Sequence, residues 1–445
     1  MRRVFILALL LGGMQLLLPL GERGYGGQWL LTFGFLILAA DTMGGLIIAF
    51  RLPRIVGYLI AGVLFGPSVL GTVSSQAIEQ LAPVSALAIA LIAILAGAEL
   101  RWSELREHGI MILKILAAEM SLTLLAVTAL LVVLRERVPF LSGTETSAAV
   151  GLSLLFAAIA VVHSPAVTMG LLTETKARGP VARTTLGVVL VSDVAVILLF
   201  SAVLSLARVL VPPASGGAPG VSLGALVWEI AGALVVGGVF GAGVAIYLRF
   251  VRRELFLFAI VVAFLGAEIA RLTHVETLLM LLTAGFAAEN MSPREAGEAL
   301  RHAMERSAAP VFVVFFALAG ASMALAQLPA LWTLVIPIVI ARLLAIWGGT
   351  WLGARWGHAS TPERRYVWLG LVSQAGVAIG LATIVAEAYP ERGPQIRTLF
   401  LAVMAINQTI GPILFRHALD RSGEIVNAEA EENETTLASR GTSPA

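Results

Sequence analysis

The chain has 445 residues, of which 58% are hydrophobic and 13% charged, with 30 Lys+Arg against 28 Asp+Glu. Soluble domains carry about a quarter charged residues, so this composition excludes an ordinary soluble protein and indicates an integral membrane protein. The chain contains no cysteine, which excludes disulfides and zinc–thiolate sites.

Apolar runs follow one another along the chain and predict an all-α polytopic membrane protein with 13 or 14 transmembrane helices. A helix needs roughly 20 apolar residues to cross a hydrocarbon core about 30 Å thick. The lower count applies if the N-terminal unit 1–28 is a signal-like segment, and the higher if it is an uncleaved helix. The expected spans are 4–20, 30–50, 55–70, 83–100, 109–134, 147–173, 183–208, 222–248, 255–271, 275–289, 308–327, 330–353, 366–388 and 398–418.

The basic residues are distributed unevenly over the loops between these spans. Threading the spans from a cytoplasmic N-terminus places 21 Lys+Arg inside and 7 outside, with Lys114 and Arg342 inside spans. This bias follows the positive-inside rule, so it predicts a multi-pass protein of the cell membrane with a cytoplasmic C-terminus. It also accounts for the basic balance without nucleic acid. The polar segment 422–445 is expected to be a disordered cytoplasmic tail.

Two pairs of similar segments indicate an internal repeat. The segment "IAGVLFGP" (60–67) resembles "TAGFAAEN" (283–290), and "LAGAEL" (95–100) resembles "LAGASM" (318–323). Both pairs are separated by 223 residues, and a fixed offset is the signature of repeated architecture.

The repeat predicts how the membrane domain, 29–421, is organised. Each half contains six helices, about 30–208 and 255–418, and the single span 222–248 joins them. An odd number of crossings turns the second half upside down, and inverted repeats with broken helices are a recurring plan of secondary transporters.

Asp193 lies in the apolar run "LGVVLVSDVAVILLF" (186–200), near the middle of a span. A charge there costs at least about 2.5 kcal/mol on insertion scales, so an intramembrane acid is a candidate functional residue. A proton and a small cation can compete for one such carboxylate. Asp193 is therefore predicted to bind H⁺ or a monovalent cation, Na⁺ or K⁺.

A second polar stretch, "AVVHSPAVTM" (160–169), interrupts another span. Pro165 removes a backbone donor and disfavours the preceding helical turn, which would free carbonyl groups that could coordinate a cation. His163 and Ser164 beside them, and Ser192 beside Asp193, are further candidate ion- or proton-binding residues. Broken backbone at this depth is tolerated only where protein or a cavity covers it. The repeat places Ser373 and Gln374, in "SQAG", in a second broken helix, although that segment lacks a proline.

Arg342 and Glu119 occupy matching positions in the two repeats. An arginine inside the membrane keeps its charge, so it needs a counter-charge, from Glu119 or Asp193, or a wet cavity. A structural, charge-compensating role is expected for Arg342 and Glu119. Glu99 and Asp41 are weaker candidates for gating residues, since each fits an interfacial or packing role as well.

These motifs resemble, in order, those of the monovalent cation:proton antiporters of the sodium/hydrogen exchanger superfamily, over about residues 30–418. The resemblance implies an antiporter without a cofactor, in which a core bundle with two crossed broken helices moves against a dimerisation domain of a homodimer. It rests on "RLPRIVGYLIAGVLFGPSVLG" (51–71), "LAGAEL" (95–100), "HSPAVTMGLLTET" (163–175), "VSDVAV" (191–196), "FFALAGASM" (315–323) and "GLVSQAGVAIGL" (370–381).

The resemblance also implies roles for individual residues. Asp193 matches the ion-binding aspartate, His163 and Ser164 match the first broken helix, and Arg342 matches a basic residue of the core. Ser192 stands where electrogenic members have a second aspartate, which implies electroneutral exchange of one cation for one proton. The potassium-efflux branch often carries a nucleotide-binding domain that this sequence lacks, which favours Na⁺ over K⁺.

Two other functions are consistent with the same residues. A sodium-coupled solute symporter would need a second polar cluster, for which Asn407 and Gln408 are the available residues. A membrane scaffold without transport would leave Asp193 replaceable. The phosphate-binding "GxxxxGK[ST]" and "GxGxxG" motifs are absent from the sequence, so neither an enzyme nor a nucleotide-driven pump is predicted.

Overall fold

The computed structural model describes residues 2–21, 27–50, 52–98, 100, 102–211, 228–251, 255–323, 328–374 and 376–425. Within them all the regular secondary structure is helical, with no strand, which confirms the all-α class. The predicted tail, apart from its first four residues, lies outside the described residues.

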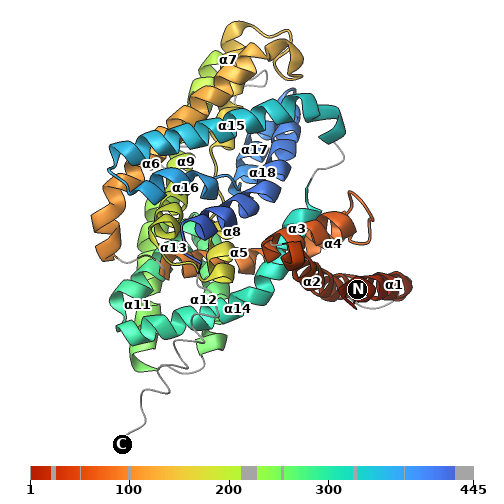
Figure 1. Cartoon of the computed structure of the whole chain (residues 1–445), viewed down its shortest axis with the longest axis vertical. Helices are drawn as coiled ribbons and strands as arrows, with labels where there is room; N and C mark the ends of the chain where they lie inside the picture. The colour runs from red at the N-terminus through yellow and green to blue at the C-terminus, as the bar shows by residue number, and fades with distance from the viewer. Residues whose placement is uncertain are drawn as a thin grey trace, which may run out of the picture.

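The helices follow the expected spans closely (Figure 1). The first part of the chain forms α1 (Arg2–Gly21), α2 (Gly27–Ile47), η1 (Ile48–Phe50), α3 (Arg54–Phe65), α4 (Ser75–Gln80), α5 (Ala82–Ala98), α6 (Trp102–Val133), η2 (Arg135–Arg137), α7 (Thr146–Ala160), α8 (Pro165–Thr175) and α9 (Pro180–Leu210). The second part forms η3 (Trp228–Gly232), α11 (Ala233–Phe250), α12 (Leu255–Thr273), α13 (Thr277–Met291), α14 (Arg294–Ala321), α15 (Leu328–Trp356), α16 (Thr361–Gly370), α17 (Gly376–Ala388) and α18 (Gly393–Arg421).

The outer faces of these helices are those of a membrane protein. Within the described residues, 8 helical stretches are long and apolar enough to cross a bilayer, and shorter apolar helices lie between them. Large apolar side chains also point outward, where a soluble protein would carry charge. On α12 these exposed side chains are Phe256, Leu257, Val261, Phe264, Leu265 and Leu272. The protein is therefore a multi-pass membrane protein.

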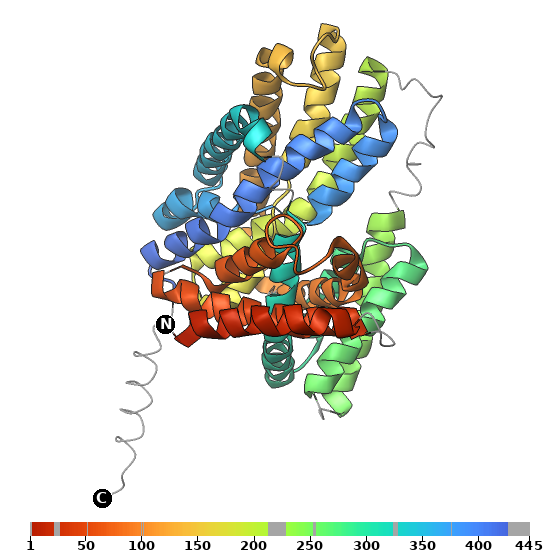
Figure 2. The same cartoon turned by 90° about the vertical axis from the view of Figure 1, so that its right-hand side faces the viewer.

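The helices form two groups, each with its own apolar core. One core joins α2, α3 and α5 to α11, α12, α13 and α14. The other joins α6, α7 and α9 to α15, α17 and α18. Figures 1 and 2 show the second group above the first, with α8 between them. Each group thus combines helices from both halves of the sequence.

Two helix crossings inside the first group repeat each other. A side chain at Gly62 would overlap the carbonyl of Ala317, and one at Gly285 would overlap the carbonyl of Ile94. Adding 223 to Gly62 gives Gly285, and adding 223 to Ile94 gives Ala317. The two glycines are therefore repeat counterparts of each other, and so are the two residues whose carbonyls they contact. This reciprocity is the geometry expected of two inverted repeats.

The last described turn of the chain reaches the start of α9. Gly423, with φ of 73°, adopts the left-handed conformation that favours glycine and ends α18. The turn brings the buried Glu424 to the N-terminus of α9, where its two carboxylate oxygens each accept a 2.8 Å hydrogen bond, from the backbone N–H of Val181 and of Ala182. A side chain at Gly179 would overlap Glu424. A residue far away in the sequence thus caps the helix that carries Asp193.

Glu424→Ala is expected to lower the free energy of unfolding by about 1–2 kcal/mol, since it removes an N-cap and a negative charge at a helix N-terminus. The apparent melting temperature of the purified protein measures this effect. Glu391→Ala, which removes an exposed carboxylate, is the matched control. Equal melting temperatures for the two variants would contradict the capping role.

Candidate functional site

The first interrupted span breaks between α7 and α8. The helix ends at Ala160 and restarts at Pro165, with Ser164 as the N-cap whose hydroxyl accepts a 3.2 Å hydrogen bond from the N–H of Val167. Proline suits the first turn of a helix because its missing donor would be unpaired there. The predicted proline break is therefore present, and His163 lies in the non-helical segment.

The second interrupted span breaks without a proline. The helix α16 ends at Gly370 and α17 begins at Gly376, leaving Leu371, Val372, Ser373 and Gln374 in a buried non-helical segment. The repeat alone predicted this break, and the structure shows it. Its carbonyl groups, like those of the first break, need partners inside the protein.

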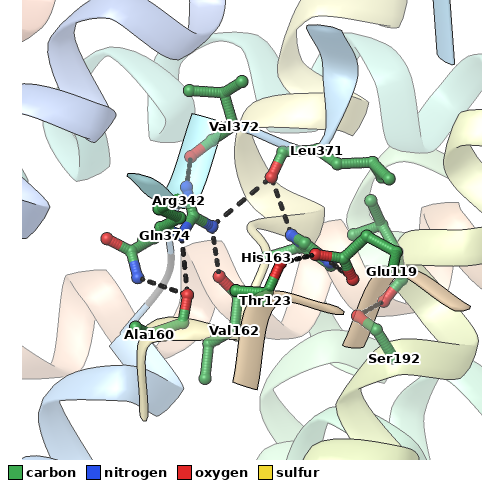
Figure 3. Close-up of polar contacts among 11 residues, drawn as sticks. Glu119, Thr123, Ala160, Val162, His163, Ser192, Arg342, Leu371, Val372 and Gln374 are labelled. Carbon is green, nitrogen blue, oxygen red and sulfur yellow. Dashed lines mark hydrogen bonds and ion pairs between the residues drawn. The ribbon is translucent and has the colours of Figure 1, made fainter. Parts of the chain in front are cut away.

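Arg342 on α15 supplies those partners for both breaks (Figure 3). Its guanidinium donates from Nε to the carbonyl of Ala160 at 2.6 Å and from Nη1 to that of Val372 at 2.7 Å. Nη2 is 3.2 Å from the carbonyl of Val162 and 3.5 Å from that of Leu371. The charge of Arg342 thus lies at the carbonyl ends of α7 and α16, where helix dipoles favour a cation. Its hydrogen bonds go to the backbone rather than to a carboxylate.

Direct hydrogen bonds also join the two breaks to each other. His163 Nδ1 lies 2.7 Å from the carbonyl of Leu371, and Gln374 donates to the carbonyl of Ala160 at 3.3 Å. Asn407 on α18 donates to the side-chain oxygen of Gln374 at 2.9 Å. Gln374 and His163, both predicted from the sequence, therefore belong to one buried network.

Glu119 on α6 joins the same network. One of its oxygens, Oε2, lies 3.1 Å from His163 Nε2, and the other accepts a 2.8 Å hydrogen bond from Thr123. Both Glu119 and His163 have exposed fractions of 0%. Glu119 also interacts electrostatically with Arg342.

Asp193 lies on α9, which packs against α6, α7, α8 and α16. Its exposed fraction is 8%, and no donor among the described residues reaches its buried Oδ1. Glu276, at the N-terminus of α13, is close enough for its charge to act on Asp193. A buried carboxylate with an open oxygen is available for a proton or a cation.

The hydroxyl groups near these residues are already engaged in local hydrogen bonds. Ser192, beside Asp193, donates to the carbonyl of Val189 on its own helix at 2.6 Å. Thr168 donates to the carbonyl of Ser164 at 3.1 Å. Ser373 is buried against α18, where a side chain at Gly411 would overlap its hydroxyl oxygen.

Of the two weaker candidates, Asp41 lies apart from this network. Asp41 has an exposed side chain on α2, although the neighbouring Gly44 packs closely against Tyr58. Glu99 lies outside the described residues.

Several network residues were not singled out from the sequence. Thr123 follows Glu119 by one helical turn, so the (i, i+4) spacing could have identified it. Asn407 had been noted only as a hint of a second polar cluster, and Glu276 not at all. Backbone carbonyls carry no side-chain signal, so no sequence pattern could assign them to Arg342.

This arrangement defines a class of protein. Reciprocal helix crossings, two interrupted spans held against each other and a buried acid beside them are the design of a secondary transporter, in which broken helices form the ion site near the repeat interface.

Comparison with known proteins gives the family. The chain belongs to the sodium/hydrogen exchanger family, whose transmembrane domain matches residues 35–419. This match confirms the resemblance found in the sequence. Members of the family are transporters rather than enzymes. Among curated proteins no match was found.

Two solved structures share the fold, both of the sodium proton antiporter MjNhaP1 from Methanocaldococcus jannaschii. One, at pH 8, has 17% sequence identity and a TM-score of 0.63, with 88% of this chain and 96% of that chain covered. The other, from electron microscopy, has 17% identity and a TM-score of 0.68, with coverages of 89% and 98%.

Proposed function

We propose that the protein exchanges a monovalent cation for H⁺ at Asp193. Cation/proton antiport follows from the family, and one observation supports this residue as the site. Asp193 is a buried carboxylate with an open oxygen on a helix packed against the first helix break. A cation and a proton can each neutralise that carboxylate, so binding one expels the other.

Charge accounting supports electroneutral exchange. Arg342 keeps its positive charge and is held by carbonyl groups, while Ser192 adds no charge beside Asp193. Replacing one bound proton by one monovalent cation therefore leaves the net charge of the site unchanged. We take Na⁺ as the preferred cation because the solved antiporters with this fold are described as sodium proton antiporters.

Alternating access would use the division into two helix groups. The group of α6, α7, α9, α15, α17 and α18 carries Asp193, Arg342 and one side of each break, and it would move against the group of α2, α3, α5 and α11 to α14. On the family resemblance, we assign homodimer formation to the group that contains α2, α3, α5 and α11 to α14. Glu424 caps α9 within the basic segment 176–183, which spans the α8–α9 loop and the first turn of α9, and this supports a C-terminus on the same, cytoplasmic side.

The polar contacts support antiport over sodium-coupled solute symport. The symporter alternative needs a second polar cluster for a solute, for which Asn407 and Gln408 are the available residues. The side-chain amide of Asn407 is instead bonded to Gln374 inside the network of the helix breaks.

Proteoliposome exchange tests this function. A pH gradient is imposed, Na⁺, K⁺ or Li⁺ is added outside, and lumenal pH is followed with and without a potassium clamp of the membrane potential. We expect Na⁺ to drive proton movement most strongly, with equal initial rates in both conditions. A rate that changes with the clamp would refute electroneutrality, and a response no larger than in protein-free liposomes would refute antiport.

A further inference from the structure

The contact between His163 and Glu119 contains a proton that the exchange at Asp193 does not use. His163 Nδ1 lies 2.7 Å from the carbonyl oxygen of Leu371. A carbonyl only accepts hydrogen bonds, so Nδ1 carries a hydrogen and donates it. The presence of a proton between the other ring nitrogen and Glu119 then decides the charge of the pair.

That second nitrogen, Nε2, lies 3.1 Å from Oε2 of Glu119. An ionised carboxylate and an unprotonated ring nitrogen are both acceptors, so a hydrogen bond between them requires one proton, on either atom. The other oxygen of Glu119 already accepts from Thr123 at 2.8 Å. The pair is therefore an imidazolium with a carboxylate or an imidazole with a carboxylic acid, and in both forms it holds one proton and is neutral overall.

The surroundings hold this proton in place. Both side chains are fully buried, and losing the proton would leave two acceptors facing each other away from water, which is costly. Among the charged side chains on α9 and α15, which pack against α6, the buried ones are Asp193 and Arg342, and Arg342 interacts with Glu119. The two breaks contribute backbone carbonyls and the neutral Gln374.

We propose that His163 and Glu119 form a second proton-binding site, whose proton stays bound during exchange and fastens the first helix break to α6, while the Nδ1 hydrogen of His163 fastens that break to the second one. The separation of this proton from the exchanged one rests on the proposed role of Asp193. The site itself rests only on the hydrogen bonds of the pair, so the two ideas can be tested separately.

The first test measures stability without any transported cation. Above neutral pH a free histidine is neutral and a free glutamate is ionised, so the unfolded chain holds no proton on this pair while the folded protein holds one. The folded state then loses stability as pH rises, by up to about tenfold in the unfolding constant per pH unit. In Glu119→Gln the amide donates a permanent hydrogen to Nε2, so this part of the pH dependence disappears.

The apparent melting temperature of purified wild type, Glu119→Gln and Glu119→Ala is therefore followed from neutral to alkaline pH. We expect a shallower decline for Glu119→Gln than for wild type, and a loss of stability at every pH for Glu119→Ala. The exposed Glu136, just beyond α6, provides the control Glu136→Gln, which keeps the wild-type slope. Equal slopes for wild type and Glu119→Gln, or a Glu119→Gln variant as unstable as Glu119→Ala, would overturn the proposal.

The second test counts protons released when Na⁺ is added to the protein in weakly buffered detergent solution. We expect wild type and Glu119→Gln to release equal numbers. A smaller release from Glu119→Gln would mean that the pair supplies the exchanged proton, which overturns the claim of retention. No release from wild type would count against the proposed antiport while leaving the stability test of the pair unaffected.

Discussion

Asp193→Asn is expected to reduce cation-driven proton movement in proteoliposomes to the level of protein-free liposomes. Asparagine has nearly the shape of aspartate but carries no negative charge, so neither a proton nor a cation can be exchanged on it. The measurement is the initial change of lumenal pH after Na⁺ is added.

The same substitution is expected to keep or raise the melting temperature, which separates loss of function from loss of fold. A buried carboxylate without a hydrogen-bond partner is unfavourable, and Asp193 has such an oxygen within the described part of the chain. Asp41→Asn is the matched control, because it removes an acid with an exposed side chain from another span; we expect it to transport. Transport by Asp193→Asn would place the site elsewhere.

The sequence was sufficient to predict the features that depend on local chemistry. Asp193 stood out because the surrounding residues are apolar, and the first break was predicted from Ser164 and Pro165, an N-cap followed by a residue suited to the first helical turn. An offset of 223 residues between similar segments predicted the repeat, and the same offset relates the two reciprocal glycine crossings. Each of these signals is carried by neighbouring residues or by a fixed spacing.

The contacts inside the site could not be predicted in the same way. Glu119 and His163 are 44 residues apart and Arg342 is about 180 residues from the first break, so no local pattern pairs them. The second break lacks a proline and depends on a partner from another helix. An ion pair for Arg342 was a reasonable expectation for an arginine inside a membrane, but two interrupted helices offer it carbonyl groups that an unbroken helix would not.

Arg342→Met is expected to lower the stability of the protein more than Glu424→Ala does. Methionine fills much of the same volume but donates no hydrogen bond. The carbonyls of Val162 and Val372 accept hydrogen bonds from Arg342 and from no other group among the described residues. Leaving two buried carbonyls unpaired costs about 2–6 kcal/mol in total. The yield and apparent melting temperature of the purified protein measure this loss.

Two further variants, Arg342→Lys and Arg355→Met, test whether the loss of stability is specific to the guanidinium of Arg342. Lysine keeps the charge but has three donors on one atom instead of a planar fork, so it should restore part of the stability and not all of it. Arg355 lies on the same helix with an exposed side chain, and Arg355→Met should change the melting temperature little. If Arg342→Met were as stable as Arg355→Met, the carbonyls of the two breaks would not depend on the guanidinium. If Arg342→Lys restored full stability, the charge of Arg342 would matter and the geometry of its donors would not.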